Sequence, residues 1–276
     1  MIGVMQGRLS PLIDNRIQAF PHNFWKNEFS VAKRIGFDLI EWVVDSESNP
    51  IFDDIQLQEI LTLSKENGIK INSLCADIFM EKYLFKNSEK EIKQNLEILE
   101  RLIIQCQKCN ITIIELPFVD SSSINNIEQQ EELIENLKSV KATAEKYNVI
   151  LGLETDLESH NFVKLLEKLD SVNIKANYDV GNSVSKNYDP LIELDVLKNW
   201  IVNVHIKDRY HDGETVPLGS GDVNFNEFFQ KLENIDYRGD LIIQGAREDL
   251  SGNIDVENTC SKYLEFINRY LEKRTE

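Results

Sequence analysis

Three side chains suited to metal coordination stand at the ends of three consecutive apolar segments. Glu154 closes VILGLE, Asp179 closes IKANYD, and His205 lies near the end of IVNVHI. Carboxylate oxygens and an imidazole nitrogen are apt ligands for Mn²⁺, Zn²⁺ or a similar divalent ion. A lone histidine on a strand is more often a hydrogen-bonded core residue, but polar residues at the same depth on three successive segments indicate a shared site. The pattern therefore predicts a metal site, if the fold brings the three ends together.

The other apolar segments also end in polar residues. Gln6 closes the first segment and Asp77 directly follows the third, Glu41 and Glu115 lie within the second and fourth, and Gln244 closes the last one, LIIQ. If all the ends meet at one face, Gln6 is a candidate substrate contact there.

Four basic residues stand close to the same segment ends: Arg8, Lys207, Arg209 and Arg247. In a chain of net charge −17 they predict the binding of a phosphate or carboxylate, for which arginine offers a planar, bidentate partner. Arg247 is the strongest candidate, because it follows Gln244 closely and Gly245 lets the backbone approach a ligand. The alternative is that each cation pairs with a neighbouring acid, for example Asp208 or Glu248.

Eight strand-like segments alternate with amphipathic helical segments along the chain. The strand candidates are IGVMQ, FDLIEWVV, IKINSLCA, ITIIEL, VILGLE, IKANYD, IVNVHI and LIIQ. Most are apolar over several consecutive positions, as parallel strands covered on both faces are. The alternation predicts an α/β fold, a single-domain (β/α)8 TIM barrel over residues 1–276, whose active site lies at the carboxyl ends of the strands. A doubly wound sheet is the alternative, but QGRLSP after Met5 is not the glycine-rich fingerprint expected there.

Local signals predict several turns and helix ends. Gly36 and Gly68 follow helical segments as C-caps, and Asn224 with Glu227 resembles a capping box. Residues 217–223, PLGSGDV, lack both nucleotide-loop patterns and predict a turn ahead of a helix, one that can close over a ligand. Cys106 and Cys109 form a C-x-x-C near the end of a helical pattern, which is typical of packing rather than of a redox or metal pair.

Composition limits the partners. Lys and Arg total 30 against 47 Asp and Glu, so the surface repels a phosphate backbone and nucleic acid is not expected as a partner. No apolar run approaches the ~20 residues needed to cross a bilayer, and no signal peptide is evident. We therefore expect a cytoplasmic protein, with no membrane partner, that acts on a small molecule.

Several segments resemble the xylose-isomerase-like TIM-barrel superfamily, in particular its sugar and sugar-phosphate isomerase/epimerase branch. The similar segments are MQGRLSP, GLETD, YDVGNS, VHIKDR and VPLGSGDVNFNEFFQKLENIDYRGDLII, of which the last resembles pentulose-5-phosphate 3-epimerases. The similarity covers nearly the whole chain and is strongest over residues 149–247. It implies a sugar or sugar phosphate as the partner, and related barrels often pair, so a homodimer is possible.

The resemblance also implies a divalent ion, Mn²⁺, Zn²⁺, Co²⁺ or Mg²⁺, held by an acid, an aspartate, a histidine and a second acid on strands five to eight. Glu154, Asp179 and His205 match the first three positions, and Asn182 falls where the family often places a substrate contact. The fourth position is Gln244, where the sequence departs from the family pattern. Glu154 and Gln244 occupy the positions of the catalytic pair, but an amide cannot accept a proton near neutral pH, although its carbonyl oxygen can ligate a metal.

Three interpretations of Gln244 follow. Glu154 can be the only carboxylate base, as in aldose–ketose isomerisation through a cis-enediol. Another acid, Glu41, Asp77 or Glu115, can supply the missing function. Alternatively, the barrel binds a sugar-like ligand without turning it over.

A different enzyme class shares this barrel, the apurinic endonucleases. They need a larger metal cluster, more histidines and a basic face. The chain has four histidines, and His22, His160 and His211 fall outside the expected strand ends. The leading hypothesis is therefore a metal-dependent sugar or sugar-phosphate isomerase or epimerase, and the alternative is a non-catalytic sugar-binding barrel.

Overall fold

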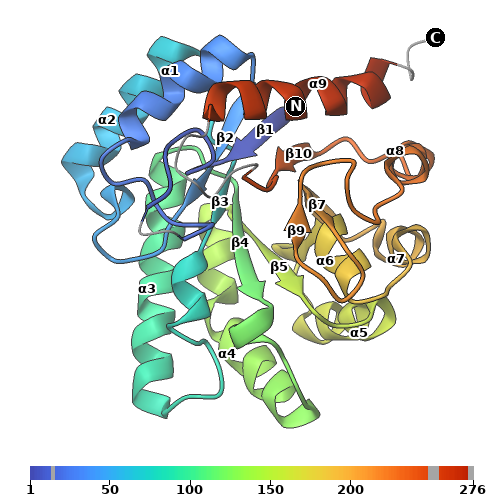
Figure 1. Cartoon of the computed structure of the whole chain (residues 1–276). Coiled ribbons are helices and arrows are strands. Elements are labelled where there is room, and N and C mark those ends of the chain that lie inside the picture. Colours follow the sequence, from blue (N-terminus) through green and yellow to red (C-terminus); the bar gives the residue numbers. More distant parts are fainter. Residues whose placement is uncertain (14–15, 248–254, 273–276) are drawn as a thin grey trace.

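A computed structural model describes residues 1–13, 16–247 and 255–272 of the chain. Eight parallel strands close into a barrel in the order β1-β10-β7-β6-β5-β4-β3-β2 (Figure 1). They are β1 (Ile2–Met5), β2 (Leu39–Val43), β3 (Ser73–Cys75), β4 (Ile113–Phe118), β5 (Ile150–Thr155), β6 (Ile174–Asp179), β7 (Ile201–Ile206) and β10 (Asp240–Ile243). All eight predicted strands are present, although β1, β2 and β3 are shorter than the apolar runs, and the predicted single-domain (β/α)8 barrel is confirmed.

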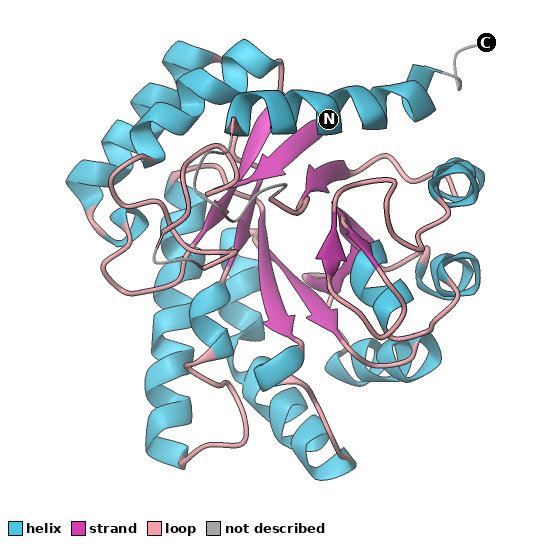
Figure 2. Cartoon of the chain, in the orientation of Figure 1, coloured by secondary structure: helices cyan, strands magenta, loops and turns pink. Residues whose placement is uncertain are grey.

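Helices surround the barrel on its outside (Figure 2). They are α1 (Trp25–Ile35), α2 (Asp54–Asn67), α3 (Glu89–Lys108), α4 (Ile127–Tyr147), α5 (Ser159–Leu169), α6 (Val180–Ser185), α7 (Pro190–Leu197), α8 (Phe225–Asn234) and α9 (Val256–Glu272). Short 3-10 turns follow β2, β3 and β4, namely η1 (Pro50–Phe52), η2 (Asp77–Met80) and η3 (Asp120–Ser122). After β7, a small antiparallel pair, β8 (Asp208–Arg209) and β9 (Thr215–Val216), folds over the barrel mouth. None of the helices in the described ranges is long and apolar enough to cross a membrane.

The helix ends follow the predicted local signals. Gly36 and Gly68 end α1 and α2 with φ angles of 102° and 69°, a left-handed conformation that glycine adopts at little cost. The Asn224 side chain accepts from the Glu227 amide and so caps the start of α8. Cys106 and Cys109, at the end of α3, are buried free thiols, and burial raises the pKa of both, which is the opposite of a reactive pair. Their interpretation as packing residues is confirmed.

Alternation along each strand separates two environments. On β2, Ile40 and Trp42 point outward to the helices, where Trp42 packs against Phe20 and Trp25. The intervening positions point into the barrel, because successive side chains of a strand face opposite sides. The interior holds an apolar cluster contributed by β1, β2, β3 and β10 and a set of buried polar side chains contributed mainly by β4, β6 and β7. The apolar cluster comprises Met5, Leu39, Val43, Cys75 and Ile242, and the polar side chains include Glu41, Glu115, Asn177, Asn203 and His205.

Candidate active site

A cavity of about 420 Å³ opens at the carboxyl ends of the strands, and the loops or ends of all eight barrel strands contribute to its wall. This volume suits a small-molecule ligand. The residues singled out from the sequence that line it are Asp77, Glu115, Glu154, Asn182, His205, Lys207, Arg209 and Gln244. The strand-end rule for barrels therefore locates this site correctly.

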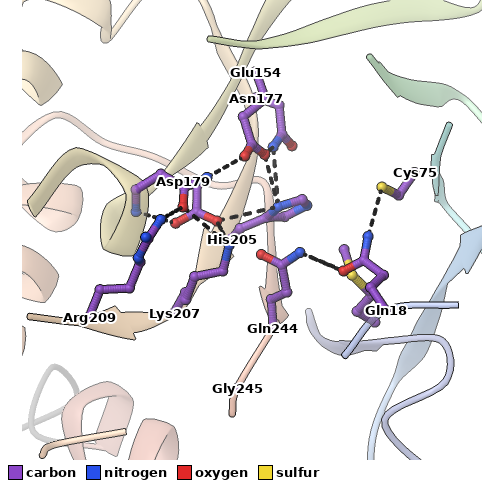
Figure 3. Close-up of polar contacts among 12 residues, drawn as sticks. Gln18, Cys75, Glu154, Asn177, Asp179, His205, Lys207, Arg209, Gln244 and Gly245 are labelled. Atoms are coloured by element: carbon purple, nitrogen blue, oxygen red, sulfur yellow. Dashed lines mark hydrogen bonds and ion pairs between the residues drawn. The ribbon is translucent and has the colours of Figure 1, made fainter. Parts of the chain in front are cut away.

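Glu154, Asp179 and His205 come together at the floor of this cavity, at the ends of β5, β6 and β7 (Figure 3). One ligand atom from each lies within 4.8 Å of the others. His205 Nδ1 is 3.2 Å from Glu154 Oε2 and 4.0 Å from Asp179 Oδ2. All three side chains are buried, so this is a preformed cluster of two carboxylates and one imidazole.

The other imidazole nitrogen faces a third buried acid, Glu41. His205 Nε2 lies 2.8 Å from Oε2 of Glu41, which is on β2 across the barrel interior. Asn203 donates from its amide nitrogen to Glu41 Oε1 and to Asn177 Oδ1, both at 2.8 Å. A histidine that gives its outer N–H to a carboxylate is left with its inner nitrogen free to ligate a metal. Glu41 is therefore placed to orient His205, and it does not line the cavity.

Two amides fix the Glu154 carboxylate. Asn177 Nδ2 donates to Oε2 at 2.8 Å, and Asn182 Nδ2 donates to Oε1 at 2.6 Å. Asn182 is itself held by its backbone amide, which donates to Asp179 Oδ1 at 2.8 Å and starts helix α6. Sequence reasoning missed Asn177 and Asn203. A signal was available, because each stands two residues before a ligand on the same strand and therefore on the same face.

The cluster carries an excess of negative charge. Burial lowers the pKa of His205, but Glu41 and Glu154 raise it more, and the result is a pKa well above that of free histidine. Burial and the neighbouring Glu154 raise the pKa of Glu115 well above that of an ordinary glutamate. Three carboxylates, those of Glu41, Glu154 and Asp179, thus surround one imidazole, and a divalent cation among them would balance this charge.

Gln244 lies beside the cluster with its amide orientation fixed (Figure 3). Its Nε2 donates to Gln18 Oε1 at 2.9 Å, and Gln18 Nε2 in turn donates to Asp77 Oδ2 at 2.6 Å. Among the described residues, no donor reaches the buried Oε1 of Gln244. Leaving a buried acceptor without a partner costs about 1–3 kcal/mol, and a cation would relieve this cost. The donor set therefore fits a divalent metal ion, with two carboxylates, one imidazole nitrogen and one amide oxygen.

Two cations close one side of the cavity, and both already have partners. Lys207 Nζ lies 2.9 Å from Asp179 Oδ2. Arg209 donates from Nε and Nη2 to the Gly213 carbonyl, at 3.1 and 2.8 Å, and from Nη1 to Asn182 Oδ1 at 2.9 Å. Lys207 and Arg209 thus support the ligand cluster.

The remaining predicted substrate contacts lie outside the cavity. Gln6 is fully buried, and its Oε1 accepts from the Val43 amide at 3.0 Å. Arg8 donates to the carbonyls of Ile17 and Gly245, and Arg247 donates to those of Gly7 and Ser10. These three side chains join the β1 and β10 loops to each other and to β2. Sequence position alone placed them at strand ends and could not show that most of their polar atoms bond to the backbone, although Gln6 Nε2 and Arg247 Nε have no partner among the described residues.

A parallel eight-stranded barrel with a buried Glu–Asp–His cluster at its carboxyl ends is a TIM-barrel protein with its candidate site in the position usual for TIM-barrel enzymes. A family model described as "Xylose isomerase-like TIM barrel" matches residues 29–267. The chain therefore belongs to the xylose isomerase-like TIM-barrel family.

Curated relatives are distant sugar-phosphate epimerases. SgbU of Haemophilus influenzae, a candidate L-ribulose-5-phosphate 3-epimerase, is 29% identical over 251 residues, which are 82% of this chain and 86% of that protein. UlaE of Shigella flexneri serotype 5b, an L-ribulose-5-phosphate 3-epimerase, is 27% identical over 232 residues, 80% of this chain and 81% of its own length. At this similarity the homology is clear, and the particular activity is not transferred by it.

Solved structures agree on the fold. A xylose isomerase domain protein from Planctomyces limnophilus superposes with a TM-score of 0.78 at 17% identity, over 99% of this chain and 97% of the other. D-psicose 3-epimerase with D-tagatose, from Clostridium cellulolyticum H10, gives a TM-score of 0.76 at 16% identity, over 98% and 99%. At such low identities these matches bear on the architecture alone.

Proposed function

We propose that the chain is a metal-dependent isomerase or epimerase that moves a proton at a carbon next to the carbonyl of a sugar. The observation that carries the proposal is the cluster of Glu154, Asp179 and His205 at the floor of a cavity large enough for a small sugar. The relatives that are named as L-ribulose-5-phosphate 3-epimerases support the same kind of chemistry.

Four side chains would hold the metal ion. Glu154, Asp179 and His205 Nδ1 form the cluster, and the unpartnered Oε1 of Gln244 adds a neutral oxygen ligand. When bound, a divalent ion such as Mn²⁺, Zn²⁺, Co²⁺ or Mg²⁺ acts as a Lewis acid that polarises the sugar carbonyl.

Glu154 is the proposed base. Each of its carboxylate oxygens accepts one amide hydrogen bond, so the group is held in one orientation and still has lone pairs available for a proton. Removal of a proton from the carbon next to the carbonyl gives an enediolate. Return of the proton by Glu154 to the adjacent carbon on the same face, with transfer of the hydroxyl proton from one enediolate oxygen to the other, completes an aldose–ketose isomerisation with one carboxylate base.

Epimerisation needs a second group on the opposite face, and Gln244 cannot be a base there. Of the three acids that could replace it, Glu41 is held against His205 away from the cavity, whereas Asp77 and Glu115 line the cavity. Glu115 stands on β4, next to β5, and burial and Glu154 raise the pKa of its carboxyl well above that of an ordinary glutamate. A raised pKa favours the protonated form, which can donate a proton, so Glu115 is the residue that we propose would extend the chemistry to epimerisation.

Asn182, Lys207 and Arg209 are the proposed contacts to sugar hydroxyls, since their polar atoms line one wall of the cavity. A barrel that binds a sugar without turning it over is the second candidate, and the observation that favours it is Gln244 in the position of the second acid. Catalysis and binding differ in one measurable property, the exchange of a substrate C–H proton.

The test is solvent exchange in D₂O with the metal-loaded protein and a panel of ketoses and aldoses, followed by NMR. We expect metal-dependent exchange of deuterium into the carbon next to the carbonyl, reduced at least ~10²-fold in Glu154→Gln. Glu158→Gln, a change of the same kind in the loop after β5 and outside the cavity wall, is the control and should retain exchange. Exchange at the wild-type rate in Glu154→Gln would contradict the assignment of the base.

A further inference from the structure

The cavity lining contains more acids than cations. Six carboxylates face it, against three cations, Arg16, Lys207 and Arg209. The six are Asp45, Asp77, Glu81, Glu115, Asp120 and Glu154. A divalent ion would offset Glu154 and the buried Asp179, but it leaves Glu81 and Asp120 exposed at the mouth with no cation within ion-pair distance among the described residues.

All three cations of the lining already have partners. Lys207 is paired with Asp179 at 2.9 Å, and Arg16 lies 3.5 Å from Asp45. The Nε and Nη2 donors of Arg209, the edge that would grip a phosphate in bidentate fashion, both bond to the Gly213 carbonyl. A phosphate monoester needs several unengaged donors, and Lys207 and Arg209, the two cations beside the Glu154–Asp179–His205 cluster, keep few of them. Of the described lining, the exposed Arg16 is the cation that still has unengaged N–H groups.

The loop after β7, where a TIM barrel often binds phosphate, already binds a carboxylate of the protein, that of Asp208. The loop after β7 carries the backbone amides of Gly219, Gly221 and Val223, which all donate to the carboxylate of Asp208 at 2.8, 2.8 and 3.2 Å. Asp208 is fully buried, and a Cβ at Gly221 would lie 2.3 Å from Asp208 Oδ1. The loop is therefore closed around this side chain, and its anion-binding amides are used.

The two arginines outside the cavity do not supply an alternative subsite. Arg8 and Arg247 line a void of only about 10 Å³, which is about the size of one water molecule and too small for a phosphate. The sequence of residues 248–254, EDLSGNI, adds two acids and no cation.

From these observations we propose that the substrate is an uncharged sugar without a phosphate group. This inference rests on the proposed sugar chemistry of the same site, and it separates the chain from relatives that are named for a phosphorylated pentulose. The contrast with those relatives rests on the charge of the cavity lining, whose amides and carboxylates suit hydroxyl groups. The loop that Asp208 holds lies in a segment that resembles pentulose-5-phosphate 3-epimerases, so it does not distinguish the chain from them.

Matched substrate pairs test the inference. Metal-loaded protein is given 2-ketopentoses and 2-ketohexoses, each alongside its terminal phosphate ester, and kcat/KM for solvent deuterium exchange is measured. We expect the free sugar of an active pair to be favoured at least ~10-fold, with a gap that narrows between 0.05 and 0.5 M salt, where ~3–14 Å screening lengths weaken the repulsion. A phosphate ester that exchanges faster than its free sugar would overturn the inference and leave the proposed function intact.

Charge variants of the mouth give a second readout. The double change Glu81→Gln and Asp120→Asn should raise the ratio of kcat/KM for the ester to that for the free sugar several-fold. The double change Glu97→Gln and Glu135→Gln, on the exposed faces of α3 and α4, alters the net charge equally and should not. An equal effect of both pairs would mean that overall charge, and not the mouth, sets the preference, and the inference would fail.

Binding of inorganic phosphate decides the matter if no sugar exchanges. In that case the proposed function fails for the sugars tried, while the charge argument is judged separately by calorimetric titration of the metal-loaded protein. Phosphate binding tighter than ~1 mM that is lost in Arg209→Gln or in Arg16→Gln would show a working phosphate subsite and overturn the inference. Weaker binding, or binding that neither substitution changes, supports it.

Discussion

Substitution of Glu41 by glutamine is the most informative single change, because Glu41 reaches the proposed metal only through His205. In the wild-type protein, Oε2 of Glu41 lies 2.8 Å from His205 Nε2 and Oε1 accepts from Asn203. In Glu41→Gln the amide oxygen would stay with the Asn203 donor, and the new NH₂ group would face Nε2. Nε2 must then be an acceptor, which moves the imidazole proton to Nδ1.

The consequence for metal binding follows from the tautomer. Nδ1 is the nitrogen that faces Glu154 and Asp179, 3.2 and 4.0 Å away, and a protonated Nδ1 cannot ligate. Loss of a carboxylate that orients a ligating histidine typically weakens metal affinity ~10–100-fold, or about 1.4–2.7 kcal/mol. We expect this loss for Mn²⁺ or Zn²⁺ in a competition titration against a chelator at pH 7.

Two variants bracket the measurement. Asp179→Asn, which removes a ligand, should abolish retained metal. Glu28→Gln changes a buried glutamate of α1 that accepts from Gly7 and Ser10 in the loop after β1, and it should leave the metal affinity within about twofold. Folding of each variant is checked by circular dichroism. Wild-type affinity in a folded Glu41→Gln protein would refute the assignment of Nδ1 as the ligand and of Glu41 as its orienting group.

Three further outcomes follow from the structure. Gln244→Glu adds a fourth carboxylate beside the cluster and should tighten divalent-metal binding about 10-fold in the same chelator titration, whereas unchanged affinity would place Gln244 outside the ligand set. Asp208→Ala leaves three backbone amides of the 217–223 loop without their acceptor and should lower the free energy of unfolding by about 2–3 kcal/mol in urea denaturation; a loss below 0.5 kcal/mol would contradict its role. Burial raises the pKa of Glu193 from about 4.5 to about 7 in the folded protein. Because the unfolded chain loses this proton at lower pH than the folded protein does, the free energy of unfolding falls as the pH rises from about 4.5 to 7. Glu193→Gln removes this loss. The difference in free energy of unfolding between Glu193→Gln and wild type should therefore shift in favour of the variant by up to about 3 kcal/mol between pH 5 and pH 8, and parallel pH profiles of the two proteins would exclude the effect.

The amino-acid sequence determined the architecture and the centre of the site. Apolar runs that alternate with amphipathic segments leave few alternatives to a parallel barrel, because each strand must be covered on both faces. Once the strands are parallel, their carboxyl ends lie on one face, so Glu154, Asp179 and His205 meet whatever the details of packing. Their strand-end positions were therefore enough to predict the cluster.

The tertiary structure alone decided what surrounds that cluster. Glu41 and Asn203 are 162 positions apart and lie on strands that are not neighbours in the barrel, so their contact depends on closure of the barrel across its interior. Gln18, 226 positions from Gln244, orients it from the loop after β1, which lies beside β10 because the first and last strands pair to close the barrel. The sequence also did not show which cations can bind a ligand. Arg8 and Arg247 stand at strand ends in the sequence, but in the structure they donate to loop carbonyls. Strand periodicity fixes the face of the sheet on which a side chain lies. Its hydrogen-bond partner depends on how distant segments pack, and the partner decides whether a polar group can bind a ligand or only supports the fold.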